Sequence, residues 1–129
     1  MKGILLVSLL TIFITSCSES FESIDSTKFN KSISGKTDIE TAEDLILLYY
    51  GFRESEGEAN ITIETKELGS GIIQVILEHD KLMDDSLRAL KIVMIVKMNG
   101  QSWTVLEIKK NWKCWEGRGH TNWGTEYCN

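Results

Sequence analysis

The feature that most constrains the fold of this chain is the dipeptide Asn99-Gly100, which lies between two long runs of alternating sequence. Asn-Gly is a strong signal for a β-hairpin, because both residues tolerate the positive φ that a tight turn requires. We therefore predict one strand from about residue 87 to 98 and a return strand from 101 to about 110. A two-residue loop predicts the cross-strand pairs Met98–Gln101, Val96–Trp103, Met94–Val105 and Val93–Leu106.

Two further strands are predicted before this hairpin. Apolar residues alternate with polar ones over residues 61–64. The alternation returns over residues 73–78, after the turn signal Gly69-Ser70-Gly71. A period of two is typical of strands, and glycine-rich breaks of this kind are typical of the turns between them.

One helix is predicted ahead of the strands, over residues 38–50, where apolar residues recur at helical spacing. Residues 37–40 have the form of a capping box, and Gly51 suits the left-handed residue that ends a helix. The prediction is an α+β domain over residues 38–129, with the helix packed on a four-stranded antiparallel meander. This order of elements is similar to that of cystatin-like small domains, a likeness that implies no function.

The first seventeen residues have the pattern of an export signal. Lys2 precedes an apolar run of about 11 residues, which is too short for a membrane-spanning helix of about 20. The segment Ile14-Thr15-Ser16-Cys17 then resembles the lipobox of bacterial lipoproteins. The resemblance implies removal of residues 1–16, lipid attachment to the Cys17 sulfur, and acylation of the new amino terminus with chains such as palmitate. The alternative is an ordinary signal peptide followed by an incidental cysteine.

The residues that follow Cys17 are predicted to form a flexible tether. Residues 18–37 contain six serines and only four larger apolar side chains, a composition that favours disorder. Ser18 resembles the outer-membrane sorting pattern of some Gram-negative lipoproteins, which favours the outer membrane over the inner one in such a cell. The domain is thus expected outside the cytoplasm, held to a membrane by its lipid, with an envelope protein or a glycan as partner.

Charge and cysteine content limit the other partners. Loss of residues 1–16 would leave 113 of the 129 residues and change the net charge from −5 to −6, because Lys2 is removed. An acidic domain lacks the basic stripe that nucleic-acid binding requires, and we predict no cofactor. The remaining cysteines, Cys114 and Cys128, are expected to form a disulfide after export. A metal site built on them is the alternative, although no Cys-x-x-Cys pair is present.

Two stretches carry residue types that are typical of functional sites. The first is Asp84-Asp85-Ser86-Leu87-Arg88, and the second is the segment from Cys114 to Cys128, which contains Gly117-Arg118-Gly119-His120 and Trp123. Together they are similar to a group of small exported bacterial proteins of unknown function. Those proteins share a DDSxR element and a C-x-x-GRGH-x-x-W-x-x-x-x-C segment, so the resemblance implies a relative without implying a reaction.

The residue chemistry of these stretches allows three interpretations. In a structural role, Arg118 would pair with Asp84 or Asp85 and pin the loop to the sheet. In a binding role, the Gly-Arg-Gly amides and the guanidinium would hold an anion or a glycan beside aromatic rings. In an enzyme, His120 would transfer protons and an aspartate would orient it. The candidate binding residues are Arg118, His120, Asp84, Asp85, Arg88, Trp115 and Trp123.

Two smaller alternatives concern the residues around these stretches. His79 and Asp80 lie close enough in sequence to Asp84 to form a cation site, although a turn between strands is the preferred interpretation, and we predict no metal. The aromatic side chains Trp112, Trp115, Trp123 and Tyr127 would serve binding if two rings share an open patch beside Arg118, and packing if all are buried.

The sequence therefore predicts a lipid-anchored cell-envelope protein that acts as a binding or structural module, with no catalytic residue assigned. A small envelope enzyme, or an anion- or glycan-binding site using Arg118 and His120, is the alternative. The enzyme requires Arg118 and His120 to converge with Asp84 or Asp85 in a concave pocket, and it requires a His120 ring that no backbone hydrogen bond occupies.

Overall fold

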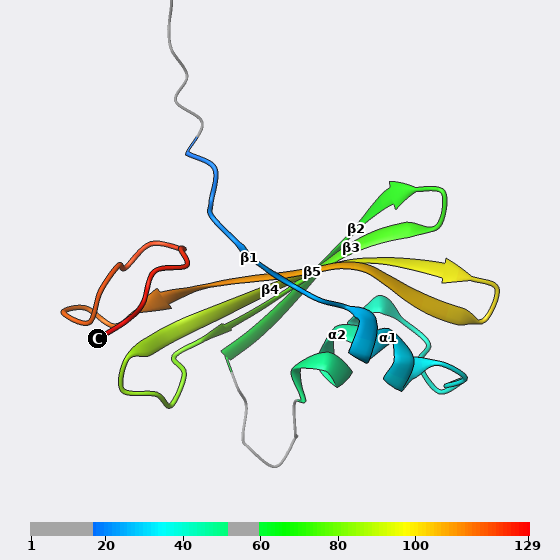
Figure 1. The fold of residues 1–129 in the computed structure, drawn as a ribbon, viewed down its shortest axis with the longest axis horizontal. Coiled ribbons are helices and arrows are strands. Elements are labelled where there is room, and N and C mark those ends of the chain that lie inside the picture. Colours follow the sequence, from blue (N-terminus) through cyan, green and yellow to red (C-terminus); the bar gives the residue numbers. More distant parts are fainter. Residues whose placement is uncertain (1–16, 52–59) are drawn as a thin grey trace, which may run out of the picture.

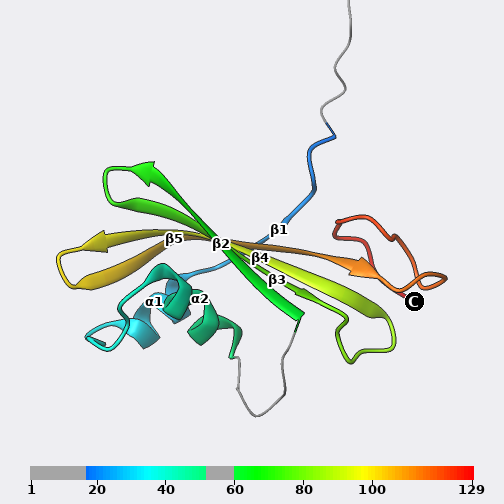
Figure 2. The ribbon, with the colours of Figure 1, turned by 180° about the vertical axis from the view of Figure 1, so that it is seen from behind.

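The computed structural model describes residues 17–51 and 60–129, so the predicted signal at residues 1–16 lies outside the described residues. The described chain forms two helices and a five-stranded antiparallel sheet (Figures 1 and 2). In chain order these are β1 (Glu22–Ile24), α1 (Thr27–Ile33), α2 (Ala42–Tyr50), β2 (Asn60–Gly69), β3 (Ile72–Asp80), β4 (Leu87–Asn99) and β5 (Ser102–Cys114). This confirms the α+β class and the meander formed by β2 to β5.

Two details of the predicted architecture are wrong. The sheet has five strands rather than four, because β1 pairs with the middle of β5 and gives the order β1-β5-β4-β3-β2. A second helix, α1, also precedes the predicted one, so the order of elements differs from the cystatin-like order. Both helices lie on the same side of the sheet (Figures 1 and 2), and their apolar faces pack with one face of β3, β4 and β5.

The core shows why the strands alternate. Its central residues, Val75, Met94 and Ile108, face one another across β3, β4 and β5 and are fully buried. Leu45 and Ile46 of α2 cover them, also without exposure to solvent. Because successive strand residues point to opposite faces, the side chains between these core positions point away from the helices.

Helix α2 begins four residues later than the capping pattern predicted. Thr41 is the N-cap: its hydroxyl accepts a hydrogen bond from the Asp44 backbone N–H, and the Asp44 carboxylate accepts one from the Thr41 N–H. The preceding Ile39 is buried, and its carbonyl accepts a hydrogen bond from the Trp103 indole. Because the Ile39 carbonyl is already bonded to Trp103, it is not needed as the acceptor of a helical hydrogen bond, which favours a helix that begins after it. The predicted end is confirmed, because Gly51 has φ of 75° and its N–H donates to the Leu47 carbonyl.

The β4–β5 hairpin is confirmed, but its predicted turn is displaced by one residue, so that the cross-strand partners near the turn are shifted by two residues. The paired residues are Asn99 with Ser102 and Met98 with Trp103, so the loop is Gly100-Gln101 rather than Asn99-Gly100. Gly100 has φ of 65° and takes the first loop position, which is where a type II′ turn requires glycine. The turn geometry therefore follows the glycine, and the asparagine belongs to the strand.

A β-bulge shifts the register a second time. Val96 pairs with Val105, and Ile95 pairs with Glu107, which leaves Leu106 as the extra residue on β5. An extra residue reverses the alternation of side chains beyond it. Beyond the bulge Met94 therefore faces Ile108 instead of the predicted Val105, and Val93 faces Lys109 instead of the predicted Leu106.

The prediction of a flexible tether over residues 18–37 is wrong, because this segment completes the sheet and the core. Strand β1 pairs with β5, and Ile33 of α1 is buried in the core. Asn30 also covers the β5 edge: its amide nitrogen donates to the Val105 carbonyl and its oxygen accepts from the Val105 N–H, both at 2.8 Å. The few apolar side chains of the segment are sufficient because the sheet supplies the rest of the buried surface.

The residues before β1 are also fixed, through what we call the N-terminal clasp of Glu19, Lys91 and Asn111. The Lys91 ammonium donates to both carboxylate oxygens of Glu19, at 2.9 and 3.2 Å, and the Asn111 amide donates to the same carboxylate at 3.2 Å and to the Ser20 carbonyl at 3.0 Å. Lys91 is 8% exposed and Asn111 is fully buried. A buried ammonium needs such a partner, because an unpaired buried charge is strongly unfavourable.

The clasp predicts a dependence of stability on pH. Its hydrogen bond from Lys91 lowers the pKa of Glu19 below the ordinary 4.5, so the carboxylate stabilises the fold above that value and the contribution is lost as the pH falls through the lowered pKa. We expect Glu19→Gln to lower the melting temperature at neutral pH and to match the wild type well below pH 4.5. A gap of the same size at both pH values would contradict this.

The control for this measurement is Glu22→Gln. Glu22 lies 3.7 Å from the Lys110 ammonium, and the two side chains are 51% and 36% exposed to solvent. Exposed ion pairs contribute little to stability, so we expect this variant to melt close to the wild-type temperature at neutral pH.

Within residues 17–51 and 60–129, no helix is both long enough and apolar enough to cross a membrane.

Candidate functional site

The Asp84 element forms a turn at the entry to β4. The Asp84 carboxylate accepts hydrogen bonds from the backbone N–H groups of Ser86 and Leu87, at 2.8 and 2.7 Å. These two bonds hold the pKa of Asp84 below its ordinary value. The carboxylate therefore caps a turn, which agrees with the turn interpretation of this region, while the neighbouring Asp85 is exposed to solvent.

Arg88 contacts a different partner from those considered in the sequence. Its Nε lies 3.3 Å from Asp80 Oδ1, and its guanidinium lies over the Trp115 ring at 5.9 Å from the centroid. The pKa of Asp80 is lowered, first by the hydrogen bond from the Lys81 backbone N–H and then by Arg88. His79 instead contacts the Tyr50 hydroxyl through Nδ1. Asp80 and His79 are thus drawn to separate partners and do not form the considered cation site with Asp84.

The disulfide loop, residues 114–128, lies at the end of the sheet opposite the β2–β3 and β4–β5 turns (Figure 1). The expected bond joins Cys114 to Cys128, with a Cα–Cα distance of 5.5 Å. Gly124 pairs with Trp112 through two backbone hydrogen bonds of 2.9 and 3.0 Å. The loop therefore continues the sheet beyond β1 and covers the last part of the β5 edge.

His120 supports the interior of this loop. Its Nδ1 lies 2.8 Å from the Asn122 carbonyl and its Nε2 lies 2.9 Å from the Glu126 carbonyl. Both partners are acceptors, so each ring nitrogen that carries a proton donates to the backbone. The enzyme alternative required a ring that no backbone hydrogen bond occupies, and the structure contradicts that requirement.

The Gly117-Arg118-Gly119 segment is a tight turn in this loop. The Arg118 N–H donates to the Trp115 carbonyl at 2.9 Å, so this amide is not available to an anion. Gly119 has φ of 148°, and a Cβ added there would lie 2.8 Å from the Cys114 sulfur. Gly119 thus permits the close approach of the backbone to the disulfide, and Gly117 supplies positive φ for the turn, which agrees with the structural interpretation of the loop.

The structure brings the two sequence motifs together, but through other contacts than those predicted. Trp115 joins them: its indole donates to the Asp84 carbonyl at 2.8 Å and its N–H donates to the Ser86 carbonyl at 2.9 Å. In the described part of the chain, the exposed Arg118 guanidinium forms no ion pair with Asp84 or Asp85. The predicted Arg118–aspartate pin is therefore wrong, and a tryptophan takes its place.

The described residues contain one group that could hold a metal ion in geometric terms. Side-chain atoms of Cys114, His120 and Cys128 all lie within 4.8 Å of one another. Both sulfurs are joined in the disulfide, however, and a metal requires them as thiolates. With the disulfide formed, Cys114 and Cys128 cannot serve as thiolate ligands, and His120 contacts the backbone of its own loop.

A shallow aromatic groove, defined by Leu87, Leu90, Trp112 and Tyr127, lies between the loop and the helix-facing side of the sheet. It has a volume of about 480 Å³, and Asp84, Ser86, Lys110 and Cys128 complete its lining. The Trp112 indole donates to the Glu126 carbonyl, which holds this ring in place. Tyr127 is 86% exposed. Two rings thus share an open surface, as the binding interpretation required, but they are Trp112 and Tyr127 and they do not lie beside Arg118.

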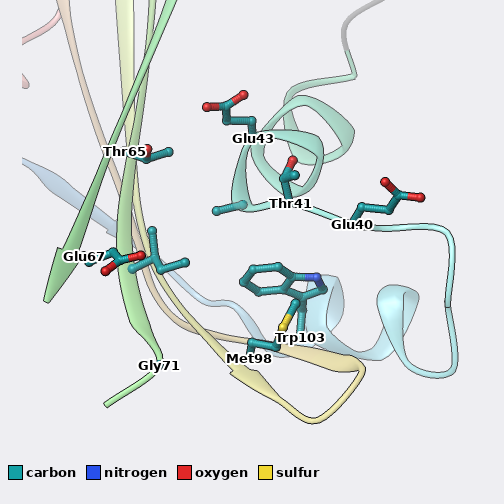
Figure 3. A pocket seen from close by; sticks show the side chains of 10 residues that line it. Glu40, Thr41, Glu43, Thr65, Glu67, Gly71, Met98 and Trp103 are labelled. Atoms are coloured by element: carbon teal, nitrogen blue, oxygen red, sulfur yellow. The ribbon is translucent and has the colours of Figure 1, made fainter. Parts of the chain in front are cut away.

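A second hollow lies at the other end of the sheet, between α2 and the strand ends (Figure 3). Trp103 and Met98 contribute its apolar surface, and Glu40, Glu43 and Glu67 lie around it. Its volume is about 510 Å³. Carboxylates around an apolar surface suit a positively charged group with an apolar stem, such as a lysine side chain. Neither sequence motif contributes to this hollow.

The residues that sequence reasoning missed lie in the segment taken for a tether and on the strands it contacts. Glu19 and Asn30 contact residues that are 72 to 92 positions away in the chain. Asn111 looks like any polar residue of an alternating strand, although it is fully buried. The one available signal was the presence of Phe29 and Ile33 at helical spacing within the serine-rich segment.

Comparison with known proteins gives no relative from which a function could be transferred. No protein family, no curated protein and no solved structure matches this chain.

Proposed function

We propose that this chain is a lipid-anchored binding module held to a membrane outside the cytoplasm, with the outer membrane favoured over the inner one in a Gram-negative cell. The state of the three cysteines carries the proposal. Cys114 and Cys128 are buried and joined in a disulfide, whereas Cys17 is exposed and free. Structural disulfides persist in compartments outside the cytosol. A free, exposed cysteine directly after an apolar run that ends in small residues is the arrangement that a lipoprotein requires.

The binding part of the proposal is supported by the aromatic groove. Tyr127 is almost fully exposed and has no role in the core, yet it lies beside Trp112 and Leu90 in one open surface. Exposed aromatic rings with polar groups around them suit sugar rings and protein side chains alike. Asp84 and Lys110 also line the groove and bring charge of both signs to it.

The enzyme alternative receives less support from the site. Both His120 nitrogens face backbone carbonyls, and the Arg118 amide is used within its turn. Neither residue lines the aromatic groove or the hollow beside α2. A general acid or base must reach the reacting group, and the His120 ring is directed into its own loop.

The anchor is tested by Cys17→Ser. We expect the wild type to remain with the membrane fraction and the variant to be soluble, because acylation at two positions gives stable anchoring and loss of the cysteine removes both. Mass spectrometry of the wild-type amino-terminal peptide should show acyl chains on Cys17. Ser20→Ala, in the same exposed segment, is the control and should stay with the membrane. A Cys17→Ser protein that still sediments with membranes would contradict the anchor.

The groove is tested by photo-crosslinking in intact cells. We expect a photoreactive phenylalanine analogue at Tyr127 to form a covalent adduct with an envelope glycan or protein, because this exposed residue lines the groove. The same analogue at Met83, which is fully exposed but outside the groove, is the control. A second experiment combines the analogue at position 127 with Trp112→Ala. Adduct formation at position 127 should fall in that variant, because the substitution removes the other ring of the groove. Equal labelling at 83 and 127 would contradict a specific groove.

A further inference from the structure

We infer that the domain lies directly against the lipid surface, with the surface formed by Cys17, Lys113, Asn122 and Trp123 facing the headgroups. The inference rests on the proposed lipidation of Cys17 and adds to it an orientation and a contact surface. It is carried by three observations: the short distance along the chain from Cys17 to the N-terminal clasp, the residues around Cys17, and the face of the sheet on which they lie.

The chain between the anchor and the domain is very short. Glu19 is held by Lys91 and Asn111, and one residue, Ser18, separates it from Cys17. Each residue of extended chain spans at most about 3.6 Å, so Cys17 stays within two such steps of the clasp. Acyl chains attached to the Cys17 sulfur would therefore begin close to the face of the sheet that carries the clasp. The bilayer that holds them must therefore lie next to that surface.

The surroundings of Cys17 suit this position. Cys17 lines a shallow pocket of about 370 Å³ together with Ser18, Glu19, Lys113, Asn122 and Trp123. The Trp123 ring contacts two ammonium groups, with its centroid 4.3 Å from Lys91 Nζ and 4.5 Å from Lys113 Nζ. Tryptophan is enriched at the boundary between lipid and water, and lysines near a membrane surface attract anionic headgroups.

The charges nearest to this surface balance one another. Glu19 and Glu78 share the Lys91 ammonium, at 2.9 and 3.4 Å, and the Lys113 ammonium supplies the second positive charge. A second aromatic ring, Phe21 in the N-terminal segment, makes a similar contact, because the Lys109 ammonium lies 4.8 Å from the centre of that ring. An acidic domain thus presents paired carboxylates, lysines and aromatic rings on the side where its anchor begins.

The same orientation leaves the aromatic groove open to a ligand. Lys91 pairs with Asn111 across β4 and β5, and the next residues, Leu90 and Trp112, also form a cross-strand pair. Adjacent strand residues point to opposite faces, so the groove lies on the side of the sheet opposite the clasp. With the clasp side against lipid, the groove would face away from the membrane.

The test uses the full, lipidated chain in phospholipid vesicles that contain anionic lipid and brominated acyl chains, which quench nearby tryptophans. We expect the bromolipid to quench the wild-type fluorescence more than that of Trp123→Phe, because Trp123 lies at the lipid surface. Glu19→Ala should lower the quenching to the level of Trp123→Phe. Glu22→Ala, which removes a carboxylate from the same segment without touching the clasp, should retain the wild-type quenching.

A second variant keeps the test valid if Glu19→Ala weakens the fold. A long Gly/Ser insertion between Ser18 and Glu19 leaves the clasp intact and lengthens the tether, so quenching of Trp123 should be lost while the melting temperature is unchanged. Equal quenching of the vesicle-bound wild type and Trp123→Phe would overturn the orientation and leave the lipid anchor standing. Failure of the wild type to float with the vesicles would instead overturn the anchor. Wild-type quenching in the insertion variant would overturn the role of the clasp.

Discussion

Replacing both loop cysteines, as Cys114→Ser with Cys128→Ser, is expected to lower the free energy of unfolding by about 3 kcal/mol. The bond closes a loop with a sequence separation of 14, and its loss returns the corresponding conformational freedom to the unfolded chain. The two cysteine residues are 1% and 6% exposed in the fold, so the serine hydroxyls that replace the sulfurs would be largely buried, which costs further free energy wherever they lack hydrogen bonds. Total stability in a domain of this size is about 5–15 kcal/mol, and the loss is therefore a large share.

Urea unfolding measures this loss, with Cys17→Ser as the common background so that both proteins are soluble. Because Cys17 is exposed and outside the disulfide, that background substitution itself should not change stability. Adding a reductant to the background protein should reproduce the shift in midpoint, and the reductant should have no effect on the double serine variant. A midpoint that is the same with and without the disulfide would contradict the prediction.

Gly119→Ala is expected to destabilise the protein by about 2–4 kcal/mol, from backbone strain and overpacking together. The residue has φ of 148°, and the new Cβ would lie 2.8 Å from the Cys114 sulfur and 3.4 Å from the Tyr127 carbonyl oxygen. Neither neighbour is a free end of a flexible side chain. The variant must therefore move the disulfide or the loop backbone to make room.

Gly117→Ala is the matched control for this substitution. It lies two residues earlier in the same loop and also has positive φ, at 82°, but a Cβ there meets no atom within 4 Å. It measures the cost of backbone strain alone, which is about 1 kcal/mol for a left-handed residue. The difference between the two variants in thermal or urea unfolding isolates the contact with the disulfide. Equal losses would show that the close contact has no energetic consequence.

The parts of the fold that the sequence predicted are those set by neighbouring residues. The alternation over β2 to β5, the end of α2 at Gly51, and the presence of a hairpin near Asn99 are local patterns, and each is found in the structure. The exact register was beyond such patterns. It depends on whether Gly100 takes the first or the second loop position, and on a bulge at Leu106 that only the packing of Ile108 into the core explains.

The proximity of the two sequence motifs was predicted, but the contacts that join them were not. The Asp84 and Cys114 stretches do meet, yet Trp115 joins them in place of Arg118, and His120 supports the loop in place of facing a ligand. Arginine and histidine attract attention because of their chemistry, but their partners depend on where the backbone carbonyls of a folded loop are directed. That arrangement has no signature along the chain.

The sequence by itself determined the α+β class, the four strands β2 to β5, the disulfide partners and the position of Cys17 behind an apolar run, since all of these depend on residue order over short stretches. The tertiary structure alone decided that residues 19–33 belong to the domain. That segment has too little apolar surface to fold by itself, and it is ordered because the sheet offers it a buried lysine, a buried asparagine and an unpaired strand edge. Partners so far apart in sequence are joined only when the strands between them have formed.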